Sequence, residues 1–184
     1  MSWSKRFVEL GKAQHDRNNF DCGSAELNNF LKTQAAKHMA SGISRTLVLP
    51  ARAVSADGKQ HICAFYTIAA SSISRSSLPD RLAKKLPHHP VPVFVLAQMA
   101  VNTPYQGQGL GRVTLITALK HFVAIQAHMR AYAVVVDCLT EDMERFYAKY
   151  GFETLCIHQG RVRMYLPMRV LGQLFSGDLA KVER

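Results

Sequence analysis

A glycine-rich segment, Gln106-Gly107-Gln108-Gly109-Leu110-Gly111-Arg112, has the composition of a phosphate-binding turn. Glycine has no Cβ, so the backbone N–H groups of such a turn are open to a close ligand. A helical pattern begins at about Leu110, and the N–H groups and dipole of a helix N-terminus attract anions. The segment lacks the Gly-Lys-Ser/Thr ending of a nucleoside-triphosphate loop and is one residue short of G-x-G-x-x-G. We therefore expect a phosphate-bearing ligand of another class, and a glycine turn without a ligand is the alternative.

The elements on either side of the turn form a βαβ pattern. An apolar run from Val93 to Val101 stops at Pro104, which predicts a buried strand. The helix that follows carries Leu115, Leu119 and Phe122 on one side, and a β-branched run, Ala131–Asp137, comes next. Strand, helix and strand in this order predict parallel neighbours joined by a right-handed crossover.

The remaining elements flank this unit. Ser24 is a suitable N-cap for a helix that buries Leu27, Phe30, Leu31 and Ala35 and runs to Gly42. Asp57-Gly58 between two apolar runs predicts a hairpin, and Thr140 is a suitable cap for a later helix. The predicted strands are 7–9, 45–51, 60–70, 153–157 and 161–166, with a long polar connection at 71–92 that holds a short helix at 80–86.

Length and composition favour one domain. A chain of 184 residues with 48% hydrophobic content can bury one core, and we expect residues 1–167 to form it. The tail, residues 168–184, has Leu171, Leu174, Phe175 and Leu179 at near-helical spacing and can pack on the body or on a partner. No apolar run is long enough to span a bilayer and the N-terminus lacks the apolar centre of a signal peptide, so we expect a cytoplasmic protein.

Cysteine spacing and net charge restrict the ligands. The four cysteines form no C-x-x-C pair and the eight histidines form no ligand pattern, so we expect free thiols and no metal. The formal charge of +10 favours a polyanionic partner such as nucleic acid, although it also fits a basic protein that is merely soluble.

Two motifs in order resemble those of the GNAT acyl-CoA-dependent N-acyltransferases. Gln106-x-x-Gly109-x-Gly111 is similar to their pyrophosphate-binding motif, and Phe146-Tyr147-x-x-x-Gly151-Phe152 is similar to the element that ends their core. The resemblance implies a single α/β domain of the GNAT fold, in which helices flank a mixed central sheet, and acetyl-CoA as cosubstrate. The pantetheine arm would pair with the strand edge, and the pyrophosphate with the turn. The implied cofactor contacts are Met99, Ala100, Val101, Gln106, Gly107, Gln108, Gly109, Leu110, Gly111 and Arg112.

The segment Phe20–Leu31 resembles the start of the GNAT toxins of bacterial toxin–antitoxin pairs, with Asn29 where Asp is common. Those toxins acetylate the α-amino group of aminoacyl-tRNA and block translation. The resemblance implies a DNA-binding antitoxin of the ribbon-helix-helix type as partner, and we also expect a homodimer.

Acyl-transfer chemistry gives the candidate residues their roles. An amine attacks a thioester only when neutral, and an α-amino group, with a pKa of about 8, is partly neutral at physiological pH. A lysine, at about 10.4, would need a base, and no Glu or His lies beside the motifs. The resemblance places Tyr147 near the thioester sulfur as general acid, with Phe146 as the packing neighbour and Tyr150 as the weaker candidate.

Basic residues are the candidate tRNA contacts: Lys32, Lys37, Arg75, Arg81, Lys84 and Lys85. A solvated charged face is the alternative interpretation of the same residues. Two other functions stay open, namely an acetyltransferase for a small amine or protein N-terminus, and a CoA- or nucleic-acid-binding module without turnover.

Overall fold

The computed structural model describes residues 3–179, and the side chains of residues 3–175. The chain forms a mixed α/β fold with two compact units, of which the first comprises Met1–Ala69 and Ala97–Ala118 and the second Ala70–Leu96 and Leu119–Arg184. Strands β4 (Gln60–Ile73) and β5 (Val91–Val101) and helix α4 (Leu110–Gln126) contribute residues to both units. The predicted mixed sheet with flanking helices is confirmed.

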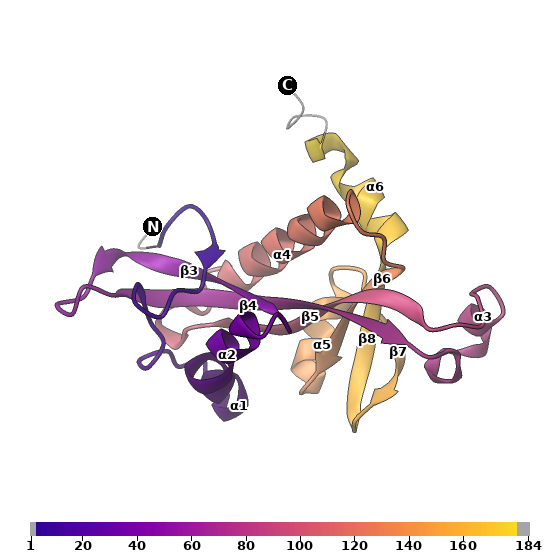
Figure 1. Ribbon diagram of the computed structural model, residues 1–184, viewed down its shortest axis with the longest axis horizontal. Helices are drawn as coiled ribbons and strands as arrows, with labels where there is room; N and C mark the ends of the chain where they lie inside the picture. Colours follow the sequence, from indigo (N-terminus) through magenta and orange to yellow (C-terminus); the bar gives the residue numbers. More distant parts are fainter. Residues whose placement is uncertain (1–2, 180–184) are drawn as a thin grey trace. The chain divides into compact units, whose positions relative to one another are not determined.

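The first unit is built on a long antiparallel hairpin (Figure 1). Strand β3 (Arg45–Val54) pairs with β4 on one edge and with the short β1 (Val8–Glu9) on the other, both antiparallel. The hairpin turns at Gly58, whose φ of +79° is the left-handed conformation that favours glycine. The Asp-Gly prediction is therefore confirmed. Strand β2 (His15–Asp16), which pairs parallel with β4, was not predicted.

The predicted first helix is present but interrupted. It consists of α1 (Ala25–Asn29), a π turn (Phe30–Gln34) and α2 (Ala35–Ala40). The hydroxyl of Ser24 accepts a hydrogen bond from the Leu27 N–H, so the predicted cap is confirmed. The expected apolar residues are buried, namely Leu27, Phe30, Leu31 and Ala35.

The strands of the second unit lie in the order β5, β6, β8 and β7. Strand β5 pairs parallel with β6 (Ala133–Cys138), as the βαβ pattern predicts. Strand β8 (Arg161–Pro167) lies between β6 and β7 (Glu153–His158) and is antiparallel to both. The closing hairpin is therefore confirmed, and its second strand returns to the centre of this unit.

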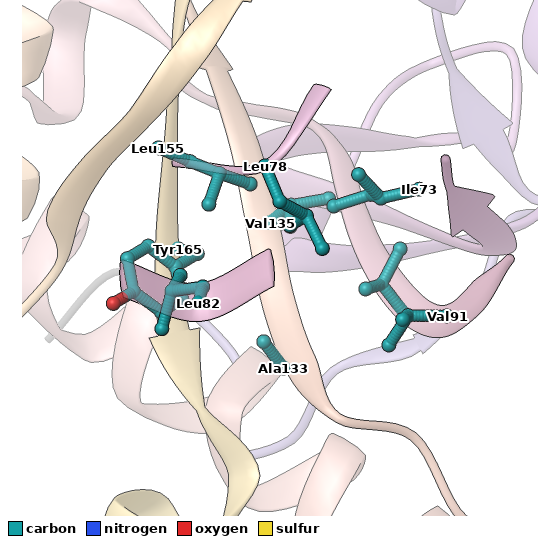
Figure 2. Packing of buried hydrophobic residues seen from close by; sticks show 9 residues of the cluster. Ile73, Leu78, Leu82, Val91, Ala133, Val135, Leu155 and Tyr165 are labelled. Carbon is teal, nitrogen blue, oxygen red and sulfur yellow. The ribbon is translucent and has the colours of Figure 1, made fainter. Parts of the chain in front are cut away.

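The connection between β4 and β5 is shorter than predicted. Because β4 continues to Ile73 and β5 starts at Val91, only residues 74–90 remain outside strands. They contain a 3-10 turn (Arg75–Ser77) and helix α3 (Asp80–Ala83). Leu78 and Leu82 are buried in a cluster with Val135 and Tyr165 (Figure 2). Apolar packing therefore anchors this connection to the sheet.

Helix α6 (Met168–Leu179) follows β8 directly. The N–H of Met168 donates to the carbonyl oxygen of Tyr132 at 2.9 Å, and Met168 and Leu171 are buried. The start of the tail is therefore packed on the second unit, while the division into residues 1–167 and 168–184 stays a prediction. No helix in the described part of the chain is long and apolar enough to cross a membrane.

Candidate active site

The glycine turn, residues Gln106–Arg112, joins β5 to α4 in the first unit. It follows a 3-10 turn (Thr103–Tyr105), and the Gln106 N–H donates to the Thr103 carbonyl oxygen at 3.2 Å. Gly107 and Gly109 have φ values of +72° and +79°, so both need the conformational freedom of glycine. A Cβ on Gly111 would meet only Val101, at 4.0 Å, which is ordinary contact. Leu110 is 1% exposed and anchors the start of α4 against Leu49 and Ala64.

The glutamine side chains of the turn bind the protein itself. Gln106 Nε2 donates to the carbonyl oxygens of Val101 at 2.8 Å and Cys22 at 3.1 Å. Gln108 Nε2 donates to the Pro104 carbonyl oxygen at 3.0 Å. Both side-chain amides therefore hold the turn in shape. The backbone of these residues remains available to a ligand.

Backbone N–H groups of the turn suit an anion. The first N–H groups of an α-helix have no intrahelical acceptor, and the helix dipole adds positive potential at the same end. Val113 N–H bonds to the Gly109 carbonyl oxygen at 3.2 Å, which closes the first turn of α4. Arg112 is exposed beside it. This geometry can hold a diphosphate.

The strand that precedes the turn has the features required for a pantetheine edge. Met99, Ala100 and Val101 form the end of β5. The described register of β5 with β6 covers Phe94 and Val95, so Met99–Val101 lie beyond that ladder. The backbone groups on this side of the strand are therefore suited to pair with the amides of an extended ligand.

The segment before α1 is tied to the same turn, which the sequence did not indicate. The carbonyl oxygen of Asp21 accepts from the Thr103 N–H and Oγ1, both at 2.8 Å. Buried Asn102 donates to the Ile62 carbonyl oxygen at 2.9 Å, and the Trp3 ring packs edge-on against Tyr105 with centroids 6.1 Å apart. Residues distant in sequence thus fix the position of the turn.

Tyr147 lies in the second unit on helix α5 (Glu141–Ala148). Thr140 caps this helix, as predicted, by accepting from the Met143 N–H at 3.3 Å. Tyr147 is 8% exposed and its ring contacts those of Phe146 and Phe152. Burial raises the pKa of Tyr147, and nearby Cys138 raises it further, so the hydroxyl is protonated at neutral pH. We expected Phe146 to be the packing residue, but Tyr147 is the more buried of the two because Phe152 folds back onto it.

A model of the acetyltransferase (GNAT) family matches residues 76–152. The tRNA-acetylating toxin of Mycobacterium tuberculosis is 30% identical over 138 residues, which are 75% of this chain and 78% of that protein. The chain belongs to the GNAT acetyltransferase family.

Other proteins match over more of the chain. A probable toxin TacT of Sinorhizobium fredii is 28% identical over 182 residues, which are 94% of this chain and 97% of that protein. The structure of AtaT complexed with acetyl-methionyl-tRNAfMet superposes with a TM-score of 0.79 at 25% identity and covers 92% of this chain and 98% of that one. An AtaT variant bound to the C-terminus of the antitoxin AtaR has the same fold, with a TM-score of 0.78 at 22% identity over 95% of this chain and 99% of that one.

The candidate tRNA contacts of this chain differ in their exposure and in their bonding partners. In the first unit Lys37 is exposed and Lys32 is half-buried, with its carbonyl oxygen bonded to Arg17. In the second unit the Arg75 guanidinium donates to the Leu86 carbonyl oxygen at 2.9 Å, and Arg81 forms an ion pair with Glu153 at 3.1 Å. Lys84 and Lys85 are exposed. The structure therefore gives Arg75 and Arg81 internal partners, so their role as tRNA contacts stays a prediction.

A buried ion pair joins β6, the strand that leads to α5, to its neighbour β8. Arg163 donates to both carboxylate oxygens of Asp137, at 2.6 Å each, and Arg163 is 8% exposed. Sequence reasoning placed Asp137 at the end of a strand and gave it no partner. Among the described residues no group of His, Cys, Asp and Glu is arranged to hold a metal ion.

Proposed function

We propose that the protein transfers the acetyl group of acetyl-CoA to the α-amino group of aminoacyl-tRNA and thereby stops translation. The observation that carries the proposal is the glycine turn, whose left-handed Gly107 and Gly109 open a backbone anion site at the start of α4. Support for the acceptor comes from the 30% identical relative, which is a tRNA-acetylating toxin.

In this proposal Met99–Val101 hold the pantetheine amides and the turn from Gln106 to Arg112 holds the pyrophosphate. The neutral α-amine attacks the thioester carbonyl carbon and forms the new C–N bond. As the C–S bond breaks, the sulfur takes the phenolic proton of Tyr147, and the proton that the amine loses passes to solvent. Tyr147 then regains a proton from solvent. The Tyr147 phenol is protonated at neutral pH, so it can supply a proton as negative charge develops on the sulfur.

The proposed partners follow from charge and from the relatives. AtaT was solved with the C-terminus of its antitoxin AtaR, and the present chain carries a formal charge of +10 that suits an acidic segment folding on binding. We propose an antitoxin of the ribbon-helix-helix type and a homodimeric toxin. We propose that this activity is cytoplasmic, because charged tRNA is used there.

The decisive experiment offers labelled acetyl-CoA and one of three acceptors to the purified protein. The acceptors are charged tRNA, a small polyamine, and a peptide with a free N-terminus. We expect label on charged tRNA and none on uncharged or N-blocked charged tRNA. Preferential labelling of the polyamine or the peptide would establish the alternative acetyltransferase. Acetyl-CoA binding without labelling of any acceptor would favour the non-catalytic module.

The partner proposal has its own test. Coexpression of the adjacent reading frame should relieve growth arrest, and its product should co-purify with the chain. Light scattering of the toxin alone should give the mass of a dimer. Persistent arrest on coexpression would contradict the antitoxin, and a monomeric mass would contradict the dimer.

A further inference from the structure

A cavity of about 160 Å³ lies within the first unit, between the first helix and strand β5. We call it the Gln98 cavity. A cavity of about 150 Å³ accommodates a benzene ring, so this one has room for an amino-acid side chain. Its lining combines two apolar side chains with four polar ones: Glu26, Leu27, Asn29, Phe30, Gln34 and Gln98.

Gln98 lines the cavity, and its side chain has a hydrogen-bond acceptor without a partner among the described residues. Its Oε1 atom is buried and has no hydrogen-bond partner within the described part of the chain. A buried polar atom without a partner is unfavourable, and a ligand that donates a hydrogen bond to it removes that cost. Gln98 directly precedes Met99, the first residue of the edge that we assign to pantetheine.

The helical wall of the cavity is formed by α1 and the π turn. Ala35 N–H bonds to the carbonyl oxygen of Phe30, the i to i+5 pattern of a π-helix. Such single turns within α-helices occur frequently at functional sites. Leu27 and Phe30 are buried and fix the wall, whereas Asn29 and Gln34 are exposed at its rim. The wall is therefore rigid at its base and open to an entering group.

We infer that the Gln98 cavity binds the amino-acid side chain of the charged tRNA and selects side chains that donate a hydrogen bond. This inference rests on the proposed function. The aliphatic part of the side chain contacts Leu27 and Phe30. Its donor bonds to Gln98 Oε1 once the Gln98 amide turns toward the cavity. Glu26 adds a carboxylate that disfavours acidic side chains. A site built around a hydrogen bond rejects an apolar analogue of the same size more strongly than an apolar pocket rejects a polar one.

The test uses one tRNA body charged with matched amino acids. Threonine and valine differ by a hydroxyl in place of a methyl group, and asparagine and leucine have similar shapes. We expect the wild type to prefer the donor in each pair by about tenfold or more in kcat/KM. Gln98→Met removes the acceptor at similar volume and should erase this preference. Gln14→Met, at an exposed glutamine of the same unit, should keep it.

Controls separate folding, acceptor chemistry and selectivity. Stabilisation of Gln98→Met by CoA will verify that the variant is folded. Gln34→Ala alters only the exposed rim and should raise the rate with glutamine relative to asparagine, because it enlarges the cavity.

If the wild type acetylates both amino acids of each pair at equal rates, the inference is wrong and the proposed function still holds. The same follows if Gln98→Met keeps the wild-type preference. An equal loss for all amino acids in Gln98→Met would assign Gln98 to the α-amine and would also overturn it. Failure to acetylate any charged tRNA would overturn the proposed function together with this inference.

Discussion

Gln106 Nε2 lies 2.8 Å from the carbonyl oxygen of Val101, so the first side chain of the glycine turn holds the last residue of β5. The same nitrogen donates to Cys22 in the segment that leads into α1. One amide therefore joins the strand edge, the turn and the first helix of the first unit. The proposed pantetheine and pyrophosphate contacts depend on this side chain for their mutual position.

Replacing Gln106 should weaken CoA binding without unfolding the protein. Gln106→Ala removes two hydrogen bonds that hold the turn, each worth about 1 kcal/mol, so the loss in affinity should be at most about 30-fold. Calorimetric titration with CoA measures the change. Thr117→Val removes a side-chain bond to Val113 farther along the same helix and should bind CoA normally. Equal affinities for wild type and Gln106→Ala would contradict the bracing role.

Two glycines of the turn should respond differently to alanine. Gly109 has a left-handed φ, so Gly109→Ala should lower the free energy of unfolding by about 1–2 kcal/mol, whereas Gly111→Ala should not. A bulky residue at either position should block the approach of the pyrophosphate and abolish thermal stabilisation by CoA. Thermal melts with and without CoA give both quantities. If CoA stabilises the bulky variants as much as the wild type, the cofactor binds elsewhere.

Tyr147→Phe should lose turnover and keep the fold. The substitution removes one hydroxyl and leaves the ring packed against Phe152, so CoA affinity should not change. Loss of a general acid lowers the rate by about 10² to 10⁴. Single-turnover acetylation at saturating acetyl-CoA measures it. Tyr150→Phe, at the neighbouring aromatic residue, is the matched control and should acetylate at the normal rate. If Tyr150→Phe is slow and Tyr147→Phe is active, Tyr150 is the general acid.

Lys84 and Lys85 should contribute more to tRNA binding than Arg81 does, because Arg81 already pairs with Glu153. Neutralising both lysines should reduce the slope of log affinity against log salt by roughly two units. Arg81→Gln should change the slope less. Filter binding of charged tRNA over a range of salt concentrations tests this, with CoA affinity as the control. If the slope of the double variant is unchanged, the lysines of the connection between β4 and β5 are solvated and do not contact tRNA.

Asp137→Asn should destabilise the second unit. The variant leaves Arg163 buried without its carboxylate, and breaking a buried pair costs about 3 kcal/mol. Asp142→Asn breaks an exposed pair with Arg145 and should leave the midpoint of urea unfolding unchanged. Equal unfolding midpoints for the two variants would show that the buried pair adds no stability.

Local signals in the sequence were sufficient for most elements of the fold. Ser24 and Thr140 cap the helices that they were expected to cap, because capping depends on the residues next to the cap. The apolar run and the glycines located β5, the turn and α4 because strand, turn and helix preferences change there within a few residues.

Features that depend on distant contacts could not be predicted. The apolar spacing of Leu27, Phe30, Leu31 and Ala35 fits a continuous α-helix, so nothing local indicated the π turn. Asp137 and Arg163 meet only because β8 returns beside β6. In the site, the residue types of the turn were readable, but the bond from Gln106 to Cys22 joins segments far apart in the chain.

The chain has a single tryptophan, Trp3, and it contacts Tyr105 immediately before the glycine turn. Indole emission responds to the polarity and motion of its surroundings. The protein therefore carries its own optical reporter next to the proposed pyrophosphate site. Occupancy of the turn can be followed by intrinsic fluorescence, in real time and on the unlabelled wild-type chain.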